Sequence, residues 1–167
     1  MRHLITAGLL PLVLLTSLPA QAQMVTISPE QIGQIFCIGS LGNDMAPVEA
    51  LLTPELSAAI AEAYAVSDAY EAANPGDKPP MGDGVQWRSW QDYADGCTVT
   101  SGMTETDNAT IEINYSFATE PAANYSNTLV LKPVVITDGM QPFWRIDDIA
   151  LGEGHTLRQA LTDAILP

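Results

Sequence analysis

The sequence predicts an α+β fold in which N-terminal helices pack on an antiparallel sheet of about four strands and a helix closes the chain. Two observations lead to this prediction. Apolar residues recur at helical spacing in the first half of the chain, and after Gly84 their spacing changes to two. The final residues return to helical spacing, so the order is helices, strands and a last helix.

Capping signals mark the start of each predicted helix. Ser28 and Thr53 each precede a proline, which favours the first helical position, and Gln31 completes a capping box with Ser28. Thr156 and Gln159 form the same pattern near the C-terminus. A short apolar segment, 45–52, separates the first two helices. The predicted helices span residues 28–41, 53–73 and 154–166.

Alternation of apolar and polar residues predicts the strands. The clearest case is "ATIEINYSF", in which Ile111, Ile113, Tyr115 and Phe117 share one face. Short turns between the segments favour an antiparallel meander. Pro133 requires a bulge or an unpaired edge, because proline has no N–H to donate. The predicted strands span residues 97–104, 109–117, 127–137 and 142–151.

Residues 1–22 have the pattern of a secretory signal peptide. Arg2 precedes an apolar run, and Ala20-Gln21-Ala22 is a small-x-small cleavage site. The run is shorter than the roughly 20 residues that cross a bilayer, so we expect no membrane anchor. We therefore expect an exported protein, periplasmic or extracellular, with one α+β domain over residues 23–167.

The charge of the chain limits its partners. It has 20 acidic residues and a formal net charge of −14, and the acids are scattered rather than gathered in one run. Such a surface repels phosphate backbones and anionic lipid, which argues against nucleic acid and membrane surfaces as partners. The charge either serves solubility or attracts a basic partner.

Two cysteines, Cys37 and Cys97, remain after signal cleavage. In an exported chain a lone pair of cysteines favours a structural disulfide, and the absence of Cys-x-x-Cys argues against a redox pair. Because about 60 residues separate them, the bridge would stabilise the fold by about 4 kcal/mol in the chain-entropy model.

No group of residues in the sequence forms a catalytic motif. His155 is the one histidine outside the signal peptide, so a multi-histidine metal site is excluded and a nucleophilic triad has a single possible base. His155 lies beside glycines, which is typical of an exposed turn. We expect no metal and no cofactor.

Two candidate sites remain. Trp87 and Trp90, with Tyr93, either line a pocket that stacks a planar or sugar-like ligand or pack half-buried around the disulfide. In the final strand, Trp144 and Asp148 would share a face, so Asp148 either reaches a pocket or is solvated and caps the next turn.

The neighbouring Asp147 cannot pair with Asp148 as a catalytic dyad, because adjacent residues of a regular strand point to opposite faces. Ile149 falls out of phase with this alternation, which predicts a bulge or the end of the strand near Asp147.

The order of several segments resembles a family of secreted bacterial proteins of unknown function. These segments are "LLTPEL", "DKPPMGDG" before "WRSWQD", a cysteine, then "FWRIDDI" and "LRQAL". The family lies near the nuclear transport factor 2-like, or cystatin-like, folds. The resemblance implies a cone in which a curved sheet wraps a long helix and leaves a pocket at its open end. In such a cone Tyr115 would join the pocket residues.

The favoured function is an exported soluble binding or interaction module for a small ligand or a protein partner. One alternative is a cofactor-free isomerase or hydrolase that uses a pocket carboxylate, as related folds permit. Another is an inhibitor or immunity-type protein that binds a basic secreted partner. The sequence leaves the ligand and the choice between monomer and dimer open.

Overall fold

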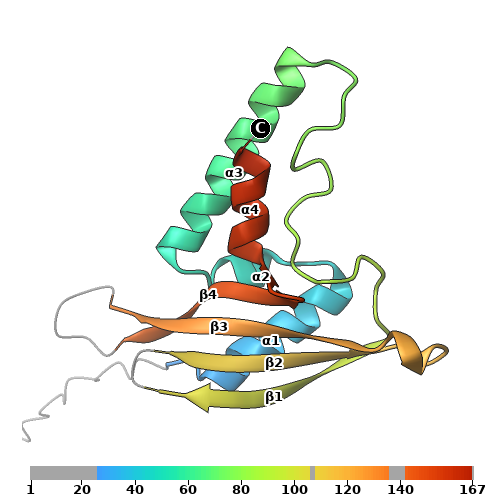
Figure 1. The fold of residues 1–167 in the computed structure, drawn as a ribbon. Helices are drawn as coiled ribbons and strands as arrows, with labels where there is room; N and C mark the ends of the chain where they lie inside the picture. The colour runs from blue at the N-terminus through green and yellow to red at the C-terminus, as the bar shows by residue number, and fades with distance from the viewer. Residues whose placement is uncertain (1–25, 106–107, 136–141, 167) are drawn as a thin grey trace, which may run out of the picture.

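An antiparallel sheet organises the fold, with one helix across a face and two helices at an edge (Figure 1). The computed structural model describes residues 26–105, 108–135 and 142–166. In chain order the elements are α1 (Pro29–Gly42), α2 (Ala46–Glu49), α3 (Pro54–Ala73), β1 (Gly96–Thr104), β2 (Ala109–Ser116), η1 (Pro121–Ala123), β3 (Tyr125–Val134), β4 (Phe143–Gly152), β5 (His155–Thr156) and α4 (Leu157–Ile165).

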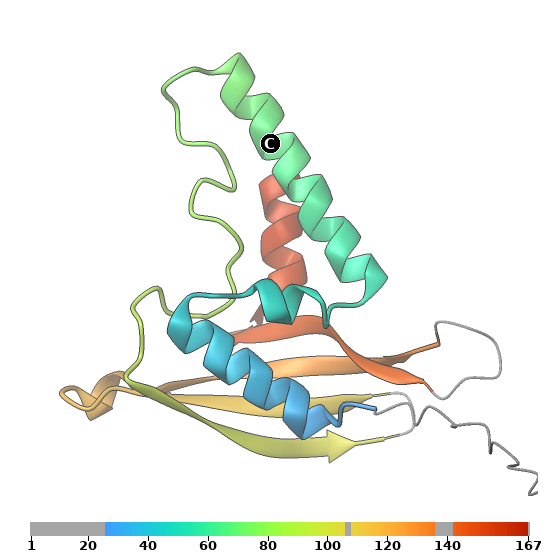
Figure 2. The same ribbon diagram turned by 180° about the vertical axis from the view of Figure 1, so that it is seen from behind.

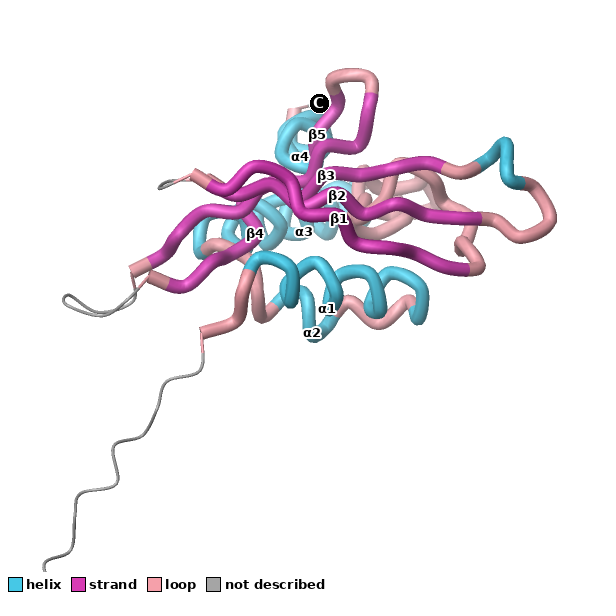
Figure 3. The backbone as a smooth tube through the Cα atoms, turned by 90° about the horizontal axis from the view of Figure 1, so that it is seen from below, coloured by secondary structure: helices cyan, strands magenta, loops and turns pink. Residues whose placement is uncertain are grey.

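The predicted α+β order is confirmed, with one correction to the sheet. Within the described residues it has five strands in the order β1-β2-β3-β4-β5, rather than about four. The additional strand, β5, has two residues and pairs with the end of β4 across a tight turn (Figure 3). A strand this short shows no periodicity, and the predicted last helix, residues 154–166, includes both of its residues.

Helix α1 lies against the strands β1 and β2 (Figure 2). Its predicted capping box is present, because the side chain of Ser28 accepts from the backbone of Gln31 and the side chain of Gln31 accepts from the backbone of Ser28. Gly33 allows the close approach, since a Cβ there would lie 2.5 Å from Cγ2 of Ile111. This glycine, which weakens the helical pattern in the sequence, is therefore required by packing.

The predicted disulfide between Cys37 and Cys97 is confirmed. It joins α1 to the start of β1 over a Cα–Cα distance of 5.9 Å. The hydrophobic core that includes Cys37 also contains buried side chains of α1 and of one face of β2, such as Phe36, Ile111 and Ile113.

The pairing of β3 with its two neighbouring strands shows how the sheet accommodates Pro133. Pairing of β3 with β2 ends at Leu131, opposite Ala109, whereas pairing with β4 continues past Pro133 to Val134. Pro133 thus lies where one edge of β3 is unpaired within the described residues, as proline requires. The register of β3 and β4 also shifts between Val130 and Leu131, which is the predicted bulge near Asp147.

Helices α3 and α4 pack together and stand away from the sheet beside β4, and we call this pair the helical arm (Figure 1). The chain before α3 joins the arm to β4, because the backbone N–H of Thr53 donates to the carbonyl of Ile146 and the N–H of Ile146 donates to the carbonyl of Leu51. The segment 74–95 then returns from the end of α3 to the start of β1.

Among the described residues, no helix combines the length and the apolar character needed to span a membrane. The predicted signal peptide, residues 1–22, lies outside the described residues.

We predict that replacing both Cys37 and Cys97 by alanine lowers the free energy of unfolding by about 4 kcal/mol, because the open chain gains conformational freedom when unfolded. Urea unfolding of the wild type and the double variant measures the difference. Wild-type protein in a strong reductant should match the variant. Labelling of both thiols in unfolded, unreduced wild type would contradict the bridge.

Candidate functional site

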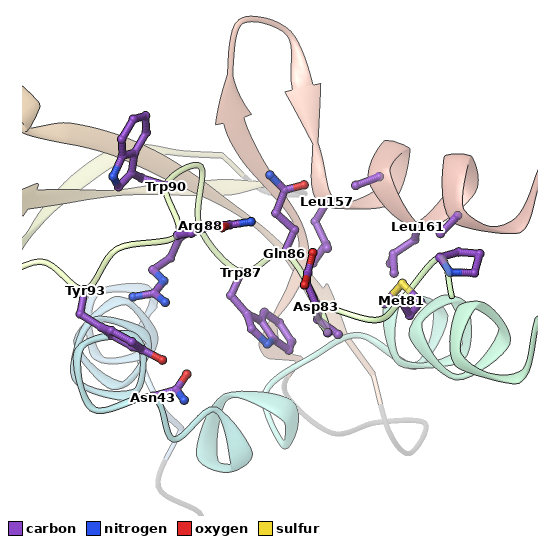
Figure 4. A pocket seen from close by; sticks show the side chains of 16 residues that line it. Asn43, Met81, Asp83, Gln86, Trp87, Arg88, Trp90, Tyr93, Leu157 and Leu161 are labelled. Atoms are coloured by element: carbon purple, nitrogen blue, oxygen red, sulfur yellow. The ribbon is translucent and has the colours of Figure 1, made fainter. Parts of the chain in front are cut away.

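The candidate site is a pocket of about 610 Å³ between the segment 80–93 and the helix α4 (Figure 4). Aromatic, amide and aliphatic side chains line it together with one carboxylate and one guanidinium, and its wall on the α4 side is apolar. The lining residues are Asn43, Pro80, Met81, Asp83, Gly84, Val85, Gln86, Trp87, Arg88, Trp90, Gln91, Tyr93, Leu157, Ala160, Leu161 and Ala164.

Residues 85–93, which we call the aromatic loop, contain no helix or strand, and side chains hold them in place. The buried Asn127 of β3 accepts from the backbone N–H of Ser89 at 3.3 Å and donates to the Ser89 hydroxyl at 2.9 Å. Arg88 donates to the carbonyl of Ser40 in α1 at 3.0 Å. The loop is therefore anchored to both the sheet and α1.

Arg88 is the one basic residue in the lining of this pocket. Its guanidinium lies 4.6 Å from the centre of the Tyr93 ring, in addition to its hydrogen bond with Ser40. These two contacts engage the cation, and Figure 4 shows it beside Tyr93. The pocket consequently presents aromatic faces and neutral amides to a ligand, beside one guanidinium whose contacts are a ring face and a carbonyl.

Trp87 and Trp90 lie on different sides of the aromatic loop. Figure 4 shows Trp87 between Tyr93 and the apolar residues Met81 and Leu161, whereas Trp90 lies apart from it. Trp87 is partly buried against the core, and Trp90 is 55 % exposed with its indole N–H donating to Asp92 at 3.1 Å. Both indoles line the pocket.

The two adjacent acids of β4 position α4, which forms the opposite wall. The Asp148 carboxylate accepts from the backbone N–H of Arg158 at 3.0 Å, in the first turn of α4. Thr156 caps the same helix end by accepting from Gln159. Asp148 is thus a capping residue and lines none of the three cavities described here.

Asp147 is a buried acid with cationic partners on two elements. It is 7 % exposed and receives the Lys132 ammonium of β3 at 2.7 Å and the Arg158 guanidinium of α4 at 2.6 Å. The hydroxyl of Thr53, the N-cap of α3, donates to it at 3.1 Å. These residues line a second cavity of about 690 Å³, together with Glu55, Pro133, Val134 and Val135.

The surroundings of Asp147 keep its carboxylate ionised. Burial acts to raise the pKa of Asp147, but the hydrogen bonds from Lys132 and Arg158, the charge of Arg158 and the hydroxyl of Thr53 outweigh it. The net pKa lies below the usual value. A carboxylate with a lowered pKa is a poor general base at neutral pH. We therefore interpret the cluster as a structural contact that links β3, α3 and α4.

Tyr115 lies in the core rather than in a pocket, because it is 2 % exposed. Its hydroxyl donates to Oγ of Ser40 at 2.9 Å, and burial raises the pKa of Tyr115 to about 12. Its ring stacks on Tyr125 at 4.6 Å between centroids. The hydrogen bond from Tyr115 therefore holds Ser40, the residue of α1 to which Arg88 also donates.

Trp144 is partly buried on β4 and lines none of the three cavities. Of the five pocket residues named from the sequence, the structure brings Trp87 and Trp90 together at a pocket and places Tyr115, Trp144 and Asp148 elsewhere. Trp144 and Asp148 do not share a strand face, because the bulge at Asp147 breaks the alternation. Of the two alternatives drawn from the sequence for Asp148, the structure shows the capping role.

Sequence reasoning missed the α4 wall of the pocket. Helical periodicity in the sequence places Leu157, Leu161 and Ile165 on one stripe, but periodicity predicts a buried face without showing what covers it. Here the aromatic loop covers part of that face. Among the described residues, no group of three or more His, Cys, Asp or Glu side chains could hold a metal ion.

Comparisons with models of protein families, with curated proteins and with solved structures found no match to this chain.

We predict that Asp147→Asn lowers the free energy of unfolding by about 3 kcal/mol at neutral pH, because two cations lose their buried partner. This is at the low end for a buried ion pair, because Lys132 is half exposed and water can solvate its charge. Asp148→Asn is the matched control. It should change stability by at most about 0.5 kcal/mol, since an amide oxygen can still accept from Arg158.

The difference between wild type and Asp147→Asn should depend on pH. Because the pKa of Asp147 is lowered by folding, its stabilisation is fully present above about pH 4 and is lost as the pH falls through the folded-state pKa. Urea titrations from pH 2 to 7 measure this convergence. A difference that stays constant over the range would contradict the assignment.

Proposed function

We propose that this chain is an exported binding module that holds a neutral planar or sugar-like ligand in the pocket between the aromatic loop and α4. The observation that carries the proposal is the composition of that pocket. Trp87, Trp90 and Tyr93 supply ring faces, and Asn43, Gln86 and Gln91 supply amide groups that both donate and accept hydrogen bonds.

The anchoring of the aromatic loop supports binding. A loop without regular structure loses affinity if it must be ordered when the ligand arrives. Here Arg88, Ser89 and Asn127 hold the loop before any ligand binds. The pocket is preorganised, which reduces the entropic cost of association.

Electrostatics favour a neutral ligand over an anion. The lining contains the carboxylate of Asp83, which pairs with Lys78, and the single guanidinium of Arg88 already contacts the Tyr93 ring and the Ser40 carbonyl. The strongly negative chain repels anions at longer range. A binding role is also favoured over the cofactor-free enzyme, because Asp147, the buried acid of the described residues, is occupied by its cations.

We further propose that the domain is related to the nuclear transport factor 2-like folds and is exported. The order of helices before an antiparallel sheet, with α1 across one face, supports the first proposal. The Cys37–Cys97 disulfide supports the second, since such bridges persist in oxidising compartments.

We predict that small neutral compounds that bind this protein do so against Trp87. A library of neutral fragments that includes mono- and disaccharides is screened by saturation-transfer NMR, and hits are mapped on the indole N–H resonances. Trp87→Ala should weaken hits about 30-fold, the cost of removing an aromatic anchor worth about 2 kcal/mol.

Tyr70→Ala is the control, because Tyr70 is a partly exposed ring on α3 that lines none of the three cavities. It should leave affinities unchanged. The proposal fails if Trp87→Ala remains folded by its amide spectrum and retains wild-type affinity, or if no fragment perturbs the aromatic loop.

A further inference from the structure

A third cavity, of about 570 Å³, adjoins the aromatic pocket at Trp90. The two cavities share Gln86, Trp90 and Ala160, but the third extends toward β3 and the turn between β4 and β5. Its lining residues are Gln86, Ser89, Trp90, Ala123, Tyr125, Leu151, Gly152, Glu153, His155, Thr156, Ala160 and Asp163.

The charge of this cavity differs from that of the aromatic pocket. Its lining includes the carboxylates of Glu153 and Asp163 and contains no lysine or arginine. Neither carboxylate belongs to a salt bridge within the described residues. Uncompensated carboxylates at a concave surface concentrate cations, and the negative charge of the whole chain adds to this effect.

Local backbone geometry holds Glu153 beside the cavity. It occupies the left-handed region with a φ of 51°, between Gly152 and Gly154, which also have positive φ. These glycines permit the tight turn that joins β4 to β5. Asp163 lies on α4, so the two carboxylates are carried by separate elements that both border the cavity.

Aromatic rings form another part of the wall. Trp90 exposes more than half of its surface, and its indole N–H donates to Asp92. The hydroxyl of Tyr125 is buried and has no hydrogen-bond partner among the described residues. Burial raises the pKa of Tyr125 while the charge of Arg88 opposes this, so the phenol is neutral.

We propose that this third cavity is a binding site for a small organic ammonium ion. Its positive charge is attracted by the π face of Trp90 and by the carboxylates of Glu153 and Asp163. A neutral ligand gains neither attraction, and an anion is repelled. This inference does not rest on the neutral ligand proposed for the aromatic pocket, because it uses Trp90 and the turn rather than Trp87.

The test uses the mature protein, 15N-labelled, and three probes at constant ionic strength: propylammonium, tetramethylammonium and neutral 1-propanol. The two cations should shift the Trp90 indole and the amides of residues 151–156 along a saturable binding curve. 1-Propanol should leave these resonances unchanged. Equal shifts with 1-propanol, or no saturable shift with either cation, would overturn the proposal.

Variants separate this site from general attraction to an acidic surface. Trp90→Ala and Asp163→Asn should each weaken cation binding about threefold or more. Asp68→Asn, which removes the same charge from an exposed position on α3, should leave it unchanged. If Asp68→Asn weakens binding as much as Asp163→Asn, the cations are only concentrated by net charge and the proposed site is wrong.

Trp87→Ala distinguishes the two proposals. It should weaken fragment binding in the aromatic pocket about 30-fold while propylammonium still shifts the Trp90 indole. Retention of fragments in Trp87→Ala contradicts the proposed function alone, whereas loss of saturable cation shifts in folded Trp87→Ala contradicts the separate ammonium site.

Discussion

The carboxylate of Asp147 is the contact on which the position of the helical arm depends. It joins Lys132 of β3, Arg158 of α4 and Thr53 at the start of α3. Burying a carboxylate is costly unless charged partners and hydrogen bonds compensate for it, and here all three partners are within hydrogen-bonding distance. Asp148, the next residue, caps α4. Two adjacent acids thus connect the sheet to the arm, and the arm provides one wall of the aromatic pocket.

The disulfide end of the molecule supports the opposite wall. Cys37 fixes α1 to β1, and the Ser40 of the same helix receives hydrogen bonds from Tyr115 and Arg88. Arg88 belongs to the aromatic loop, so one connected set of contacts runs from the disulfide to the pocket. The loop needs these side-chain anchors because it has no strand or helix of its own. Trp90, on the far side of the loop, belongs to both cavities.

The helices and strands could be predicted from the sequence because their formation depends on residues that are close together in the chain. Caps at Ser28 and Thr53 located two helices, and alternation located four strands, because both depend on neighbouring residues. The phase of Ile149 indicated a bulge near Asp147, which the register confirms. The bulge also determines which of the two acids is buried, and the sequence pattern did not predict which one. The pocket was harder still, since an irregular loop and a distant helix form it.

Hydrogen exchange of individual amides in Asp147→Ala, with Asp148→Asn as the reference, tests most directly whether Asp147 holds the arm to the sheet. We expect amides of α4 and of the first turns of α3 to exchange about 100-fold faster in Asp147→Ala, corresponding to about 3 kcal/mol. Amides of α1 and β1, which the disulfide joins, and of β2, which pairs with β1, should keep their protection. An equal loss of protection in all these elements, or no loss in α4, would show that Asp147 does not hold the helical arm to the sheet.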